Sequence, residues 1–480
     1  MISEDYIVLS ADVQHLVSAQ QAWHYRIVPQ ELQPKEALGF YIGEQADAAD
    51  LENELELLFE KKIRFERKEE ELIQRTLSRY YRNTVEHSNA TAVNTGSIKS
   101  DNFLQVLIME AKNLGSSDIH IEVYEEKCRI RIRIDGHLIE RYSVGKADYP
   151  TLINKIKIKG NLDISEKRLP QDGRIFFKTE ELRIDIRVSV LPTLHGEKIV
   201  LRLLNNDSSD IDIRQLGFTK KELDDYLEGI KKPHGIILVS GPTGSGKTTT
   251  LYATLKILNQ EKSNIITIED PIEYTLEGVN QVQMKEDIGL TFAAALRSFL
   301  RQDPDVIMLG EIRDAETAHM AIRAALTGHL VLSTIHTNSA WGTVSRLLDM
   351  GVPSFLLAGT LNTSIAQRLV RLLCTVCKVE KPFDPALFPK NFRYEKAPET
   401  HCIAVGCKEC HYTGYKGRKA LYEVIPIDFE LAEHIKNNTF GIEPLLKARN
   451  IHTLRENAMA LFGQGLTSID EIYPILINNY

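Results

Sequence analysis

A phosphate-binding loop constrains this chain more than any other feature. The loop has the pattern GxxxxGKT and reads Gly241-Pro242-Thr243-Gly244-Ser245-Gly246-Lys247-Thr248. An apolar run over Gly235–Ser240 precedes it and the run Thr249–Leu255 follows it, which predicts the order strand, loop, helix that the motif requires. Glycines let backbone N–H groups turn toward phosphate oxygens, and the N-terminus of the next helix adds positive potential. The sequence therefore predicts a nucleotide site over residues 241–249.

Two side chains of the loop and the residue after it complete this prediction. We expect the Lys247 ammonium to reach the β- and γ-phosphates of ATP and the Thr248 hydroxyl to bind Mg²⁺, with Thr249 continuing the cradle. The alternative is a glycine-rich turn that arose by chance. The strand before the loop and the helix after it argue against that alternative.

Length and composition bound the architecture. The 480 residues are too many for one hydrophobic core, so we expect several domains. The net charge of −8 argues against a chain that binds polyanions as a whole. The start, Met1–Asp5, lacks the features of a signal peptide, and no apolar run approaches the ~20 residues that span a bilayer. We therefore expect a cytoplasmic chain whose six cysteines are reduced or metal-bound.

The pattern of apolar residues predicts the domain organisation. In the first part, helices are expected over Asp50–Glu60 and Lys68–Tyr81, with a short strand at Ile63–Phe65. The expected boundaries are residues 1–83 for a small partner-docking domain, 84–100 for a polar linker, 101–205 for an α+β domain, 206–210 for a hinge, and 211–480 for an α/β core that includes a cysteine module at 371–421.

The α+β domain is read from alternating side chains. A helix is expected over Asn102–Ala111, and the alternation in Asp118–Glu122 and Cys128–Ile134 predicts half-buried strands. Asp135-Gly136 is typical of a hairpin turn, and a basic helix is expected over Tyr149–Lys159. The arginines at 129, 131 and 133 are interpreted as a solvated sheet face. Further strands are expected at Arg174–Phe177, Leu182–Ser189 and Lys198–Leu204.

Nucleotide hydrolysis also needs acidic groups beside the phosphates. The apolar strand Asn264–Ile268 leads to Glu273, and the strand Asp305–Leu309 leads to Glu311. Carboxylates at the ends of strands next to a phosphate loop are suited to holding Mg²⁺ or an attacking water. We expect Glu311 to be the general base and Glu273 to hold water or metal, and the choice between the two stays open. A third strand ends at His336, which is either a γ-phosphate sensor or a structural residue.

These motifs resemble the secretion ATPase superfamily, specifically the type II secretion and type IV pilus assembly ATPases. The resemblance is carried by TIEDPIEY at 267–274, LRQDPDVIMLGEIRD at 300–314 and TGHLVLSTIHTN at 327–338. Upstream, SSDIHIE, RIDG, RLPQDGR and GEKIVLRLL are similar to the domain that precedes the ATPase core in that family. Residues 1–83 are only loosely similar to it.

The resemblance implies a fold and an assembly. It implies a RecA-like P-loop ATPase core, a preceding α+β domain of the PAS-like kind, and a hexameric ring with ATP between the two large domains. It also implies arginines that neutralise charge on the transferring phosphate, and by position these are Arg187 and Arg202. In the core, Arg297 and Arg301 flank Phe299 on one expected helix and are further candidates.

The cysteines form two CxxC pairs, Cys374 with Cys377 and Cys407 with Cys410. Two such pairs can supply four thiolates in tetrahedral geometry, which suits Zn²⁺. A redox-active CxxC usually stands alone near a thioredoxin-like pattern, which is absent here. Cys402 is a spare cysteine, and His401 and His411 are possible substitute ligands. The same module occurs in the secretion and pilus assembly branch of the family, and retraction motors generally lack it.

The leading hypothesis is a cytoplasmic, hexameric ATPase motor at the inner face of the cytoplasmic membrane. It would power type II protein secretion or type IV pilus assembly through inner-membrane platform proteins, without binding nucleic acid directly, and the choice between secretion and pilus assembly stays open. One alternative is a nucleic-acid translocating ATPase with a zinc ribbon, against which the net acidity argues. The other is a nucleotide-binding scaffold that does not hydrolyse ATP, against which the intact carboxylates argue.

Overall fold

The computed structural model describes residues 6–7, 9, 13, 16–17, 19–30, 37–44, 46, 48–59, 61–81, 103–179, 183–204, 212–389, 392, 398–439 and 441–477. The chain divides into two compact units. The first comprises Met1–Asn206, Cys374–Lys378 and Ala404–Lys416, and the second comprises Asp207–Leu373, Val379–Ile403 and Gly417–Tyr480. The expected linker at 84–100 and hinge at 206–210 lie outside the described residues. The domain boundaries themselves stay a prediction.

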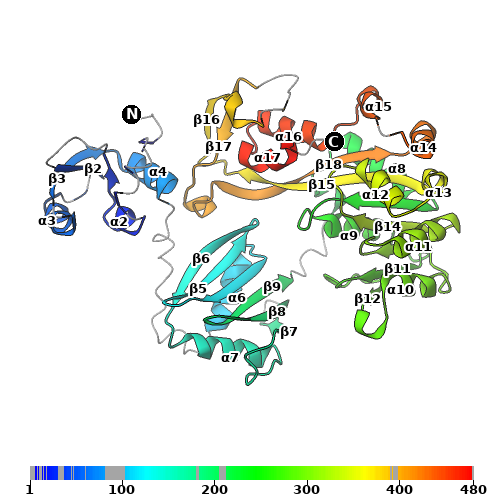
Figure 1. The fold of residues 1–480 in the computed structure, drawn as a ribbon, viewed down its shortest axis with the longest axis horizontal. Helices are drawn as coiled ribbons and strands as arrows, with labels where there is room; N and C mark the ends of the chain where they lie inside the picture. The colour runs from blue at the N-terminus through cyan, green and yellow to red at the C-terminus, as the bar shows by residue number, and fades with distance from the viewer. Residues whose placement is uncertain are drawn as a thin grey trace. The chain divides into compact units, whose positions relative to one another are not determined.

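The beginning of the chain forms a small three-stranded sheet in the order β1-β2-β3. β3 runs parallel to β2, with α3 as the crossover, and β1 is antiparallel to β2. The elements are α2 (Ala19–His24), β1 (Val28–Pro29), β2 (Ala37–Gly43), α3 (Ala48–Phe59), β3 (Lys62–Lys68) and α4 (Glu70–Tyr80) (Figure 1). Both predicted helices are confirmed, and the strand predicted at Ile63–Phe65 is longer than expected. Trp23, Phe40 and Ile73 lie in one hydrophobic core.

The next part of the first unit is a six-stranded antiparallel sheet in the order β6-β5-β4-β9-β8-β7. Its elements are α6 (Phe103–Asn113), β4 (Asp118–Val123), β5 (Cys128–Ile134), β6 (His137–Val144), α7 (Tyr149–Lys159), β7 (Gln171–Lys178), β8 (Arg183–Thr193) and β9 (Gly196–Leu204). Alternate strand residues pack with α6 and α7 in one core, because side chains along a strand point to opposite faces. Asp135 and Gly136 both have positive φ, as the predicted hairpin turn requires.

The opposite face of this sheet is charged, and here the prediction of a solvated arginine face is wrong. Arg129 and Arg131 both pair with Glu122, at 2.9 Å and 2.7 Å, and the side chains of the two arginines are only 23% and 24% exposed. Arg133 pairs with Asp118 at 3.4 Å. Asp118 and Glu122 on β4 lie directly opposite Arg133 and Arg129 on β5, and Arg131 reaches Glu122 diagonally, so ion pairing draws the arginine side chains onto the sheet.

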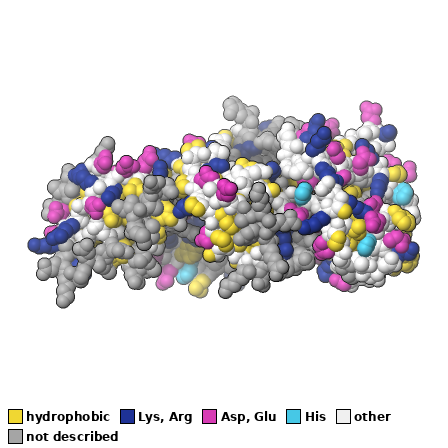
Figure 2. Space-filling view, turned by 90° about the horizontal axis from the view of Figure 1, so that it is seen from above, with side chains coloured by type: hydrophobic (Ala, Val, Ile, Leu, Met, Phe, Trp, Pro, Cys, Tyr) yellow, Lys and Arg dark blue, Asp and Glu magenta, His cyan; other side chains and the backbone are white. Residues whose placement is uncertain are grey.

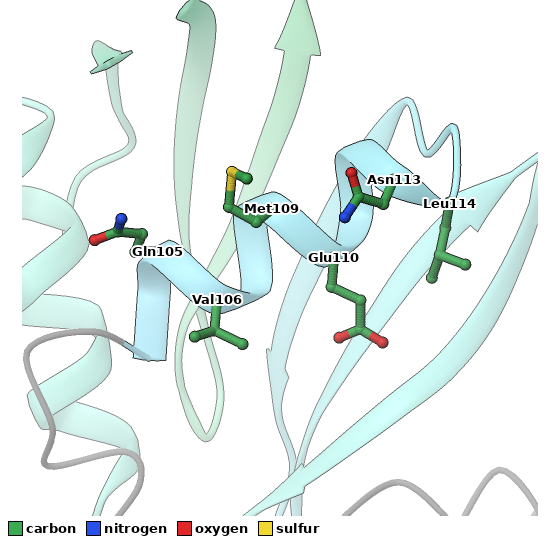
Figure 3. A pocket seen from close by; sticks show the side chains of 6 residues that line it. All are labelled: Gln105, Val106, Met109, Glu110, Asn113 and Leu114. Carbon is green, nitrogen blue, oxygen red and sulfur yellow. The ribbon is translucent and has the colours of Figure 1, made fainter. Parts of the chain in front are cut away.

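Helix α6 has a second, exposed face. Val106 is 55% exposed, while Leu104 and Leu107 on the other side of the helix are buried in the core. A shallow hollow of about 500 Å³ lies along this face, and Figure 3 shows the side chains that line it: Gln105, Val106, Met109, Glu110, Asn113 and Leu114. Arg141 forms an ion pair with Glu110 beside it.

The second unit is built on a seven-stranded sheet in the order β12-β11-β13-β14-β10-β15-β18. The strands are β10 (Gly235–Ser240), β11 (Ile265–Glu269), β12 (Asn280–Gln283), β13 (Val306–Leu309), β14 (Leu330–Ile335), β15 (Leu361–Leu373) and β18 (Tyr415–Pro426). All pairs from β12 to β15 are parallel, which confirms the predicted parallel α/β core. β10 lies between β14 and β15, so the loops at the carboxyl ends of these three strands are neighbours.

Helices cover both faces of this sheet, because its strands are apolar on both sides. Ile237 and Val239 pack in the core that contains α8 and α9, whereas Ile236 and Leu238 pack in the core that contains α10 to α13. The helices are α8 (Lys220–Ile230), α9 (Lys247–Leu258), α10 (Phe292–Phe299), α11 (Ala315–Leu326), α12 (Gly342–Asp349), α13 (Ser354–Thr360), α14 (Phe429–Lys436), α15 (Glu443–Ala448), α16 (Leu454–Gly463) and α17 (Ile469–Ile477).

Short elements complete the chain. They are the 3₁₀ turns η3 (Ile213–Gln215), η4 (Glu286–Ile288), η5 (Pro385–Leu387) and η6 (Lys408–Cys410), and the antiparallel pair β16 (Val379–Pro382) and β17 (Thr400–Ile403). In the described residues, no helix combines the length and apolar character that crossing a bilayer needs. Acidic and basic side chains are interspersed over the described part of the face in Figure 2, without a basic stripe.

Candidate nucleotide and metal sites

The phosphate loop follows β10 and is shaped by three glycines. Gly241, Gly244 and Gly246 have φ of +149°, +81° and +87°, a region that side chains other than glycine rarely adopt. Gly246 is the N-cap of α9, so the first turn of that helix opens directly onto the loop. The backbone N–H groups of a first helical turn have no partner within the helix, which makes this end attractive to phosphate.

The loop rests on β15, and this support was missed by sequence reasoning. A Cβ at Gly241 would lie 2.4 Å from the Gln367 carbonyl oxygen, so only glycine fits there. The Gln367 side chain is buried; its Nε2 donates to the Ser245 carbonyl at 2.8 Å, and its Oε1 accepts from the Thr250 hydroxyl at 2.9 Å. Gln367 therefore ties the middle of the loop to the helix that follows it. The only local signal was that Gln367 and Arg368 interrupt the otherwise apolar stretch Ile365–Val370.

Three side chains of the loop, those of Lys247, Ser245 and Thr248, can donate hydrogen bonds to phosphate oxygens or bind a metal ion. The Lys247 ammonium donates to the carbonyl oxygens of Gly241 and Pro242 at 2.8 Å and 3.0 Å, so it lies over the loop. Burial lowers the pKa of Lys247, as does nearby Arg368, while Glu311 acts in the opposite direction. The Ser245 hydroxyl is buried without a hydrogen-bond partner among the described residues, and Thr248 is exposed. A bound phosphate would give the Ser245 hydroxyl an acceptor.

Glu311 lies two residues beyond β13 and has two partners. Its Oε2 is 3.2 Å from His336 Nε2, and its Oε1 pairs with Arg313. The Glu311 side chain is only 15% exposed. The structure thus brings Glu311 and His336 into contact, and Lys247 follows β10, the strand next to the one that leads to His336. Arg313 had no role in the sequence prediction, although it is part of the motif at 300–314; it also lies 3.9 Å from Asp270.

Glu273 lies on the segment that follows β11 and is half-buried. Its backbone N–H donates to the Tyr252 hydroxyl at 3.3 Å. Tyr252 belongs to α9, so the structure ties Glu273 to the helix that carries Lys247 and Thr248.

Arg368 links two of the predicted motifs. Its Nη1 donates to the Gln367 carbonyl at 3.0 Å, and its Nη2 donates to the Asn338 carbonyl and side-chain oxygen at 3.1 Å and 3.2 Å. The loop that carries His336 is therefore held against β15 by a guanidinium close to the phosphate loop. Sequence reasoning missed this residue as well, because its partners are far away in the chain.

The predicted helix around Arg297 and Arg301 is shorter than expected. α10 ends at Phe299, so Arg301 lies beyond the helix, and the prediction that one helix carries both arginines is wrong. After Phe299 the chain tightens, since the N–H groups of Arg301 and Gln302 donate to carbonyls three residues back, and Pro304, which has no N–H, keeps the helix from resuming. Arg297 pairs with Glu316 at 2.9 Å, and Arg301 donates to the Arg297 carbonyl at 2.8 Å.

Arg187 and Arg202 lie on β8 and β9 of the six-stranded sheet. They face each other across the two strands, on the charged side of the sheet. Arg202 Nε donates to Asp118 Oδ1 at 3.0 Å, and the Arg202 side chain is 58% exposed.

The four predicted cysteines form one cluster. The Sγ atoms of Cys374, Cys377, Cys407 and Cys410 all lie within 4.8 Å of one another. The Sγ–Sγ distances are 3.9 Å for Cys374–Cys407, 3.7 Å for Cys377–Cys410 and 3.8 Å for Cys407–Cys410. Four sulfurs around an ion at about 2.3 Å would be about 3.8 Å apart, whereas a disulfide needs about 2.05 Å. His401 packs instead against the Phe462 ring, and Cys402 belongs to β17. The donor set and its spacing fit a metal ion.

Backbone donors support thiolates in this cluster. Gly406 N–H points at Cys377 Sγ at 3.3 Å, and the N–H groups of Cys407 and Gly414 point at Cys410 Sγ at 3.1 Å and 3.3 Å. A hydrogen bond from Cys377 and these two N–H groups lower the pKa of Cys410 to about 5. Gly406 is required by the turn, since a Cβ there would lie 2.7 Å from the Tyr412 carbonyl. Metal binding needs thiolates, and this turn favours one at Cys410, whereas the hydrogen bond to Cys410 and burial raise the pKa of Cys377.

The sequence is similar to known proteins over most of its length. A sequence model of the family described as "Type II/IV secretion system protein" matches residues 94–474. The chain is 48% identical over 375 residues to the "Type IV pilus assembly ATPase PilB" of Myxococcus xanthus, which covers 77% of this chain and 66% of that protein. It is 45% identical over 373 residues to the "Type II secretion system protein E" of Pseudomonas aeruginosa, covering 78% of this chain and 74% of that protein.

A solved structure is also similar. The pilus retraction motor PilT with bound ADP superposes with a TM-score of 0.54 and 28% identity, covering 78% of this chain and 96% of that one. This chain spans just under two thirds of the Myxococcus relative, so the match does not extend over that whole protein.

Proposed function

Since the chain belongs to the family of type II/IV secretion system ATPases, we propose that it hydrolyses ATP to drive protein secretion or pilus assembly. The observation that carries the proposal is the arrangement at the ends of neighbouring strands. Lys247 lies over the phosphate loop after β10, and Glu311 after β13 contacts His336, which follows β14, the strand between β13 and β10. A carboxylate beside a phosphate-binding lysine is what activation of water for phosphoryl transfer needs.

Each residue of this site has a proposed role. The loop amides of residues 241–249 and Lys247 bind the phosphates, and the exposed Thr248 hydroxyl holds Mg²⁺, which supplies charge neutralisation when bound. Glu311 accepts a proton from the attacking water. His336, in hydrogen-bond contact with Glu311, reports on the state of the γ-phosphate. Glu273 helps to hold the metal or the water.

Arginines are proposed to neutralise charge on the transferring phosphate. Arg187 and Arg202 have this role by family resemblance, and it is supported by their directly opposed positions on adjacent strands, where the Arg202 side chain stays 58% exposed beside its partner Asp118. Arg297 and Arg301 are proposed to act in the same way in an assembled ring. The ring is a homo-hexamer in this proposal, as the resemblance implies.

The remaining proposals concern location and metal. The chain acts in the cytoplasm at the inner face of the cytoplasmic membrane, where platform proteins hold it, and the part at 1–83 docks to a partner. The four-cysteine cluster holds Zn²⁺, because four thiolates at tetrahedral spacing prefer that ion. Its role is structural, since four protein ligands leave no open position for chemistry.

Orthophosphate release by the full-length chain with Mg²⁺ and ATP tests the function. Molar mass is measured by light scattering in the same samples, with and without a non-hydrolysable ATP analogue. We expect phosphate release that depends on Mg²⁺ and a shift to a hexamer with the analogue. A chain that remains monomeric and releases no phosphate, also in the presence of its membrane platform protein, contradicts the proposal.

A further inference from the structure

Tyr252 lies at the centre of a buried hydrogen-bond network under the nucleotide site. The residue is fully buried on α9, and its hydroxyl donates to Glu269 at the end of β11. The same oxygen accepts from the Glu273 backbone N–H and from Gln281 Nε2, both at 3.3 Å. A phenol has one proton to donate and two lone pairs to accept with, so this hydroxyl is fully used.

Glu269 is the anchor of the network. It is 3% exposed and accepts from the Thr267 hydroxyl at 2.7 Å and from Gln281 Nε2 at 3.0 Å, in addition to Tyr252. Within the described part of the chain its partners are neutral groups, and no ion pair with it is present. Burying a carboxylate without a cation is costly, so a buried carboxylate that persists needs all of its neutral donors in place.

The network ties down the segment that carries Glu273. The Gln281 side chain accepts from the Leu276 backbone N–H at 2.7 Å and donates to the Tyr274 carbonyl at 3.1 Å. The Tyr274 ring packs edge-on against the Tyr252 ring, with centroids 4.6 Å apart. The segment from Glu273 to Leu276 is thus held at both ends by groups that themselves contact Tyr252.

The helix connects this network to the phosphate loop. Thr248 and Tyr252 are four residues apart on α9, so they share one face of the helix, one turn from each other. The Tyr252 hydroxyl thus joins the helix that carries Thr248 to the backbone of Glu273.

We infer that Tyr252, with Glu269 and Gln281, is a positioning residue that sets Glu273 against the metal-binding hydroxyl of Thr248. The inference rests on the proposed function, because it assigns a task within the same ATPase site. It predicts that the tyrosine hydroxyl affects turnover and not nucleotide affinity, since no group of the network belongs to the phosphate loop. Misplacing a group at a reacting centre by about 1 Å can cost roughly 10²-fold in rate.

The test compares Tyr252→Phe with Tyr226→Phe in the full-length chain. Tyr226 is an equally buried tyrosine whose hydroxyl bonds to Thr254 on the same helix, away from the acidic segment. Both variants lose one buried hydroxyl, so both should lower the melting temperature. Only Tyr252→Phe should lower kcat, by roughly 10–100-fold, with KM and the affinity for a fluorescent ATP analogue within a factor of about 3 of the unmodified chain.

The outcomes separate the inference from the function it rests on. If the unmodified chain releases no phosphate, the proposed function fails. If it does and Tyr252→Phe keeps its kcat, or Tyr226→Phe loses as much, the positioning role is refuted. Should Tyr252→Phe not fold, Gln281→Met serves instead, because it removes the half-buried amide that holds Tyr274 and Leu276. A kcat equal to that of the unmodified chain then refutes the inference in the same way.

Discussion

Arg187 on β8 lies directly opposite Arg202 on β9, on the same face of an antiparallel sheet. Arg174 on β7 lies opposite Arg187 in turn, so three arginines follow one another across three strands. Like charges at directly opposed positions destabilise a sheet. Asp118 balances part of this charge through its ion pair with Arg202 at 3.0 Å, and an added anion would offset more of the repulsion.

Replacing Arg187 by methionine should therefore separate activity from stability. We expect phosphate release to fall by roughly 10³-fold, the scale of an arginine that stabilises a transferring phosphate. Hydrogen-exchange protection of β8 and β9 should stay the same or rise, because the repulsion with Arg202 is removed. Arg141→Met is the matched control: it breaks the ion pair with Glu110, so protection should fall locally while turnover is unchanged. Normal turnover in Arg187→Met would exclude its proposed role.

The Glu311→Gln variant tests the general base. An amide has the shape of the carboxylate but cannot take a proton from water, so turnover should be lost while ATP binds with nearly normal affinity. The measurements are orthophosphate release and equilibrium binding of a fluorescent ATP analogue. Because Glu311 contacts His336, the variant His336→Gln should show a smaller loss. Turnover in Glu311→Gln at the rate of the unmodified chain would contradict the assignment of Glu311 as general base and favour Glu273.

Loss of the metal should be local. In Cys374→Ser we expect the bound zinc to fall from one ion per chain to near zero, because structural zinc contributes about 10–16 kcal/mol to such sites. Hydrogen exchange should become fast at Cys374–Lys378 and Ala404–Lys416. Cys402→Ser is the control, since Cys402 is also buried but lies outside the cluster. Equal zinc content in the two variants, measured by elemental mass spectrometry, would contradict the assignment.

Glu122 makes the six-stranded sheet sensitive to acid. Burial alone would raise its pKa, but hydrogen bonds from Arg131, Arg129 and Lys198 outweigh burial and hold the pKa at about 2. A carboxylate with a lowered pKa stabilises the fold above its ordinary value of 4.5, and this contribution is lost as the pH falls toward 2. The shift corresponds to stability on the order of 3 kcal/mol.

The variant Glu122→Gln tests this linkage. It should lower the hydrogen-exchange protection of β4 at pH 7, because it leaves three cations without their acid. The difference from the unmodified chain should shrink as the pH is lowered from about 4.5 toward 2, because in this window the unfolded chain binds a proton at Glu122 before the folded chain does. Glu140→Gln removes a weaker contact with Arg129, at 3.5 Å, and should have little effect. A difference that is constant with pH would rule out Glu122 as its source.

Gly241 should be irreplaceable for steric reasons. Gly241→Ala would bring a methyl group to 2.4 Å from the Gln367 carbonyl, so the loop would have to move away from β15 and ATP binding should be lost. Gly289→Ala is a control for backbone strain alone, because Gly289 also has positive φ but has open space around it. That variant should lose about 1 kcal/mol of stability and keep its affinity for ATP. Equal affinity in both variants would show that the clash is relieved elsewhere.

Local sequence signals predicted the elements whose determinants are close together in the chain. β5 and α7 have the predicted bounds, and the turn at Asp135-Gly136 has the backbone that its residues favour. The cysteine cluster also follows from spacing, because each CxxC turn places two sulfurs and only the two turns have to meet.

Contacts between distant segments could not be read in the same way. Gln367 lies 122 residues from the Ser245 carbonyl that it supports, and nothing near either residue indicates the pairing. The alternation in the strand of Arg129 and Arg131 predicts a solvated face, but the register with β4 places Glu122 opposite Arg129, where it pairs with both arginines. In each case a polar side chain finds its partner through strand order, which the pattern of a single strand does not contain.

The strand order β13-β14-β10-β15 has one more consequence. Glu311, His336, Lys247 and Gln367 come from four separate segments, yet each follows or belongs to one of four adjacent strands. A nucleotide that contacts this edge therefore bridges four adjacent strands of the sheet. Binding without turnover should therefore stabilise the second unit. Its free energy of unfolding should rise by about 4 kcal/mol when the nucleotide concentration is a thousand times its Kd, and its melting temperature should rise accordingly.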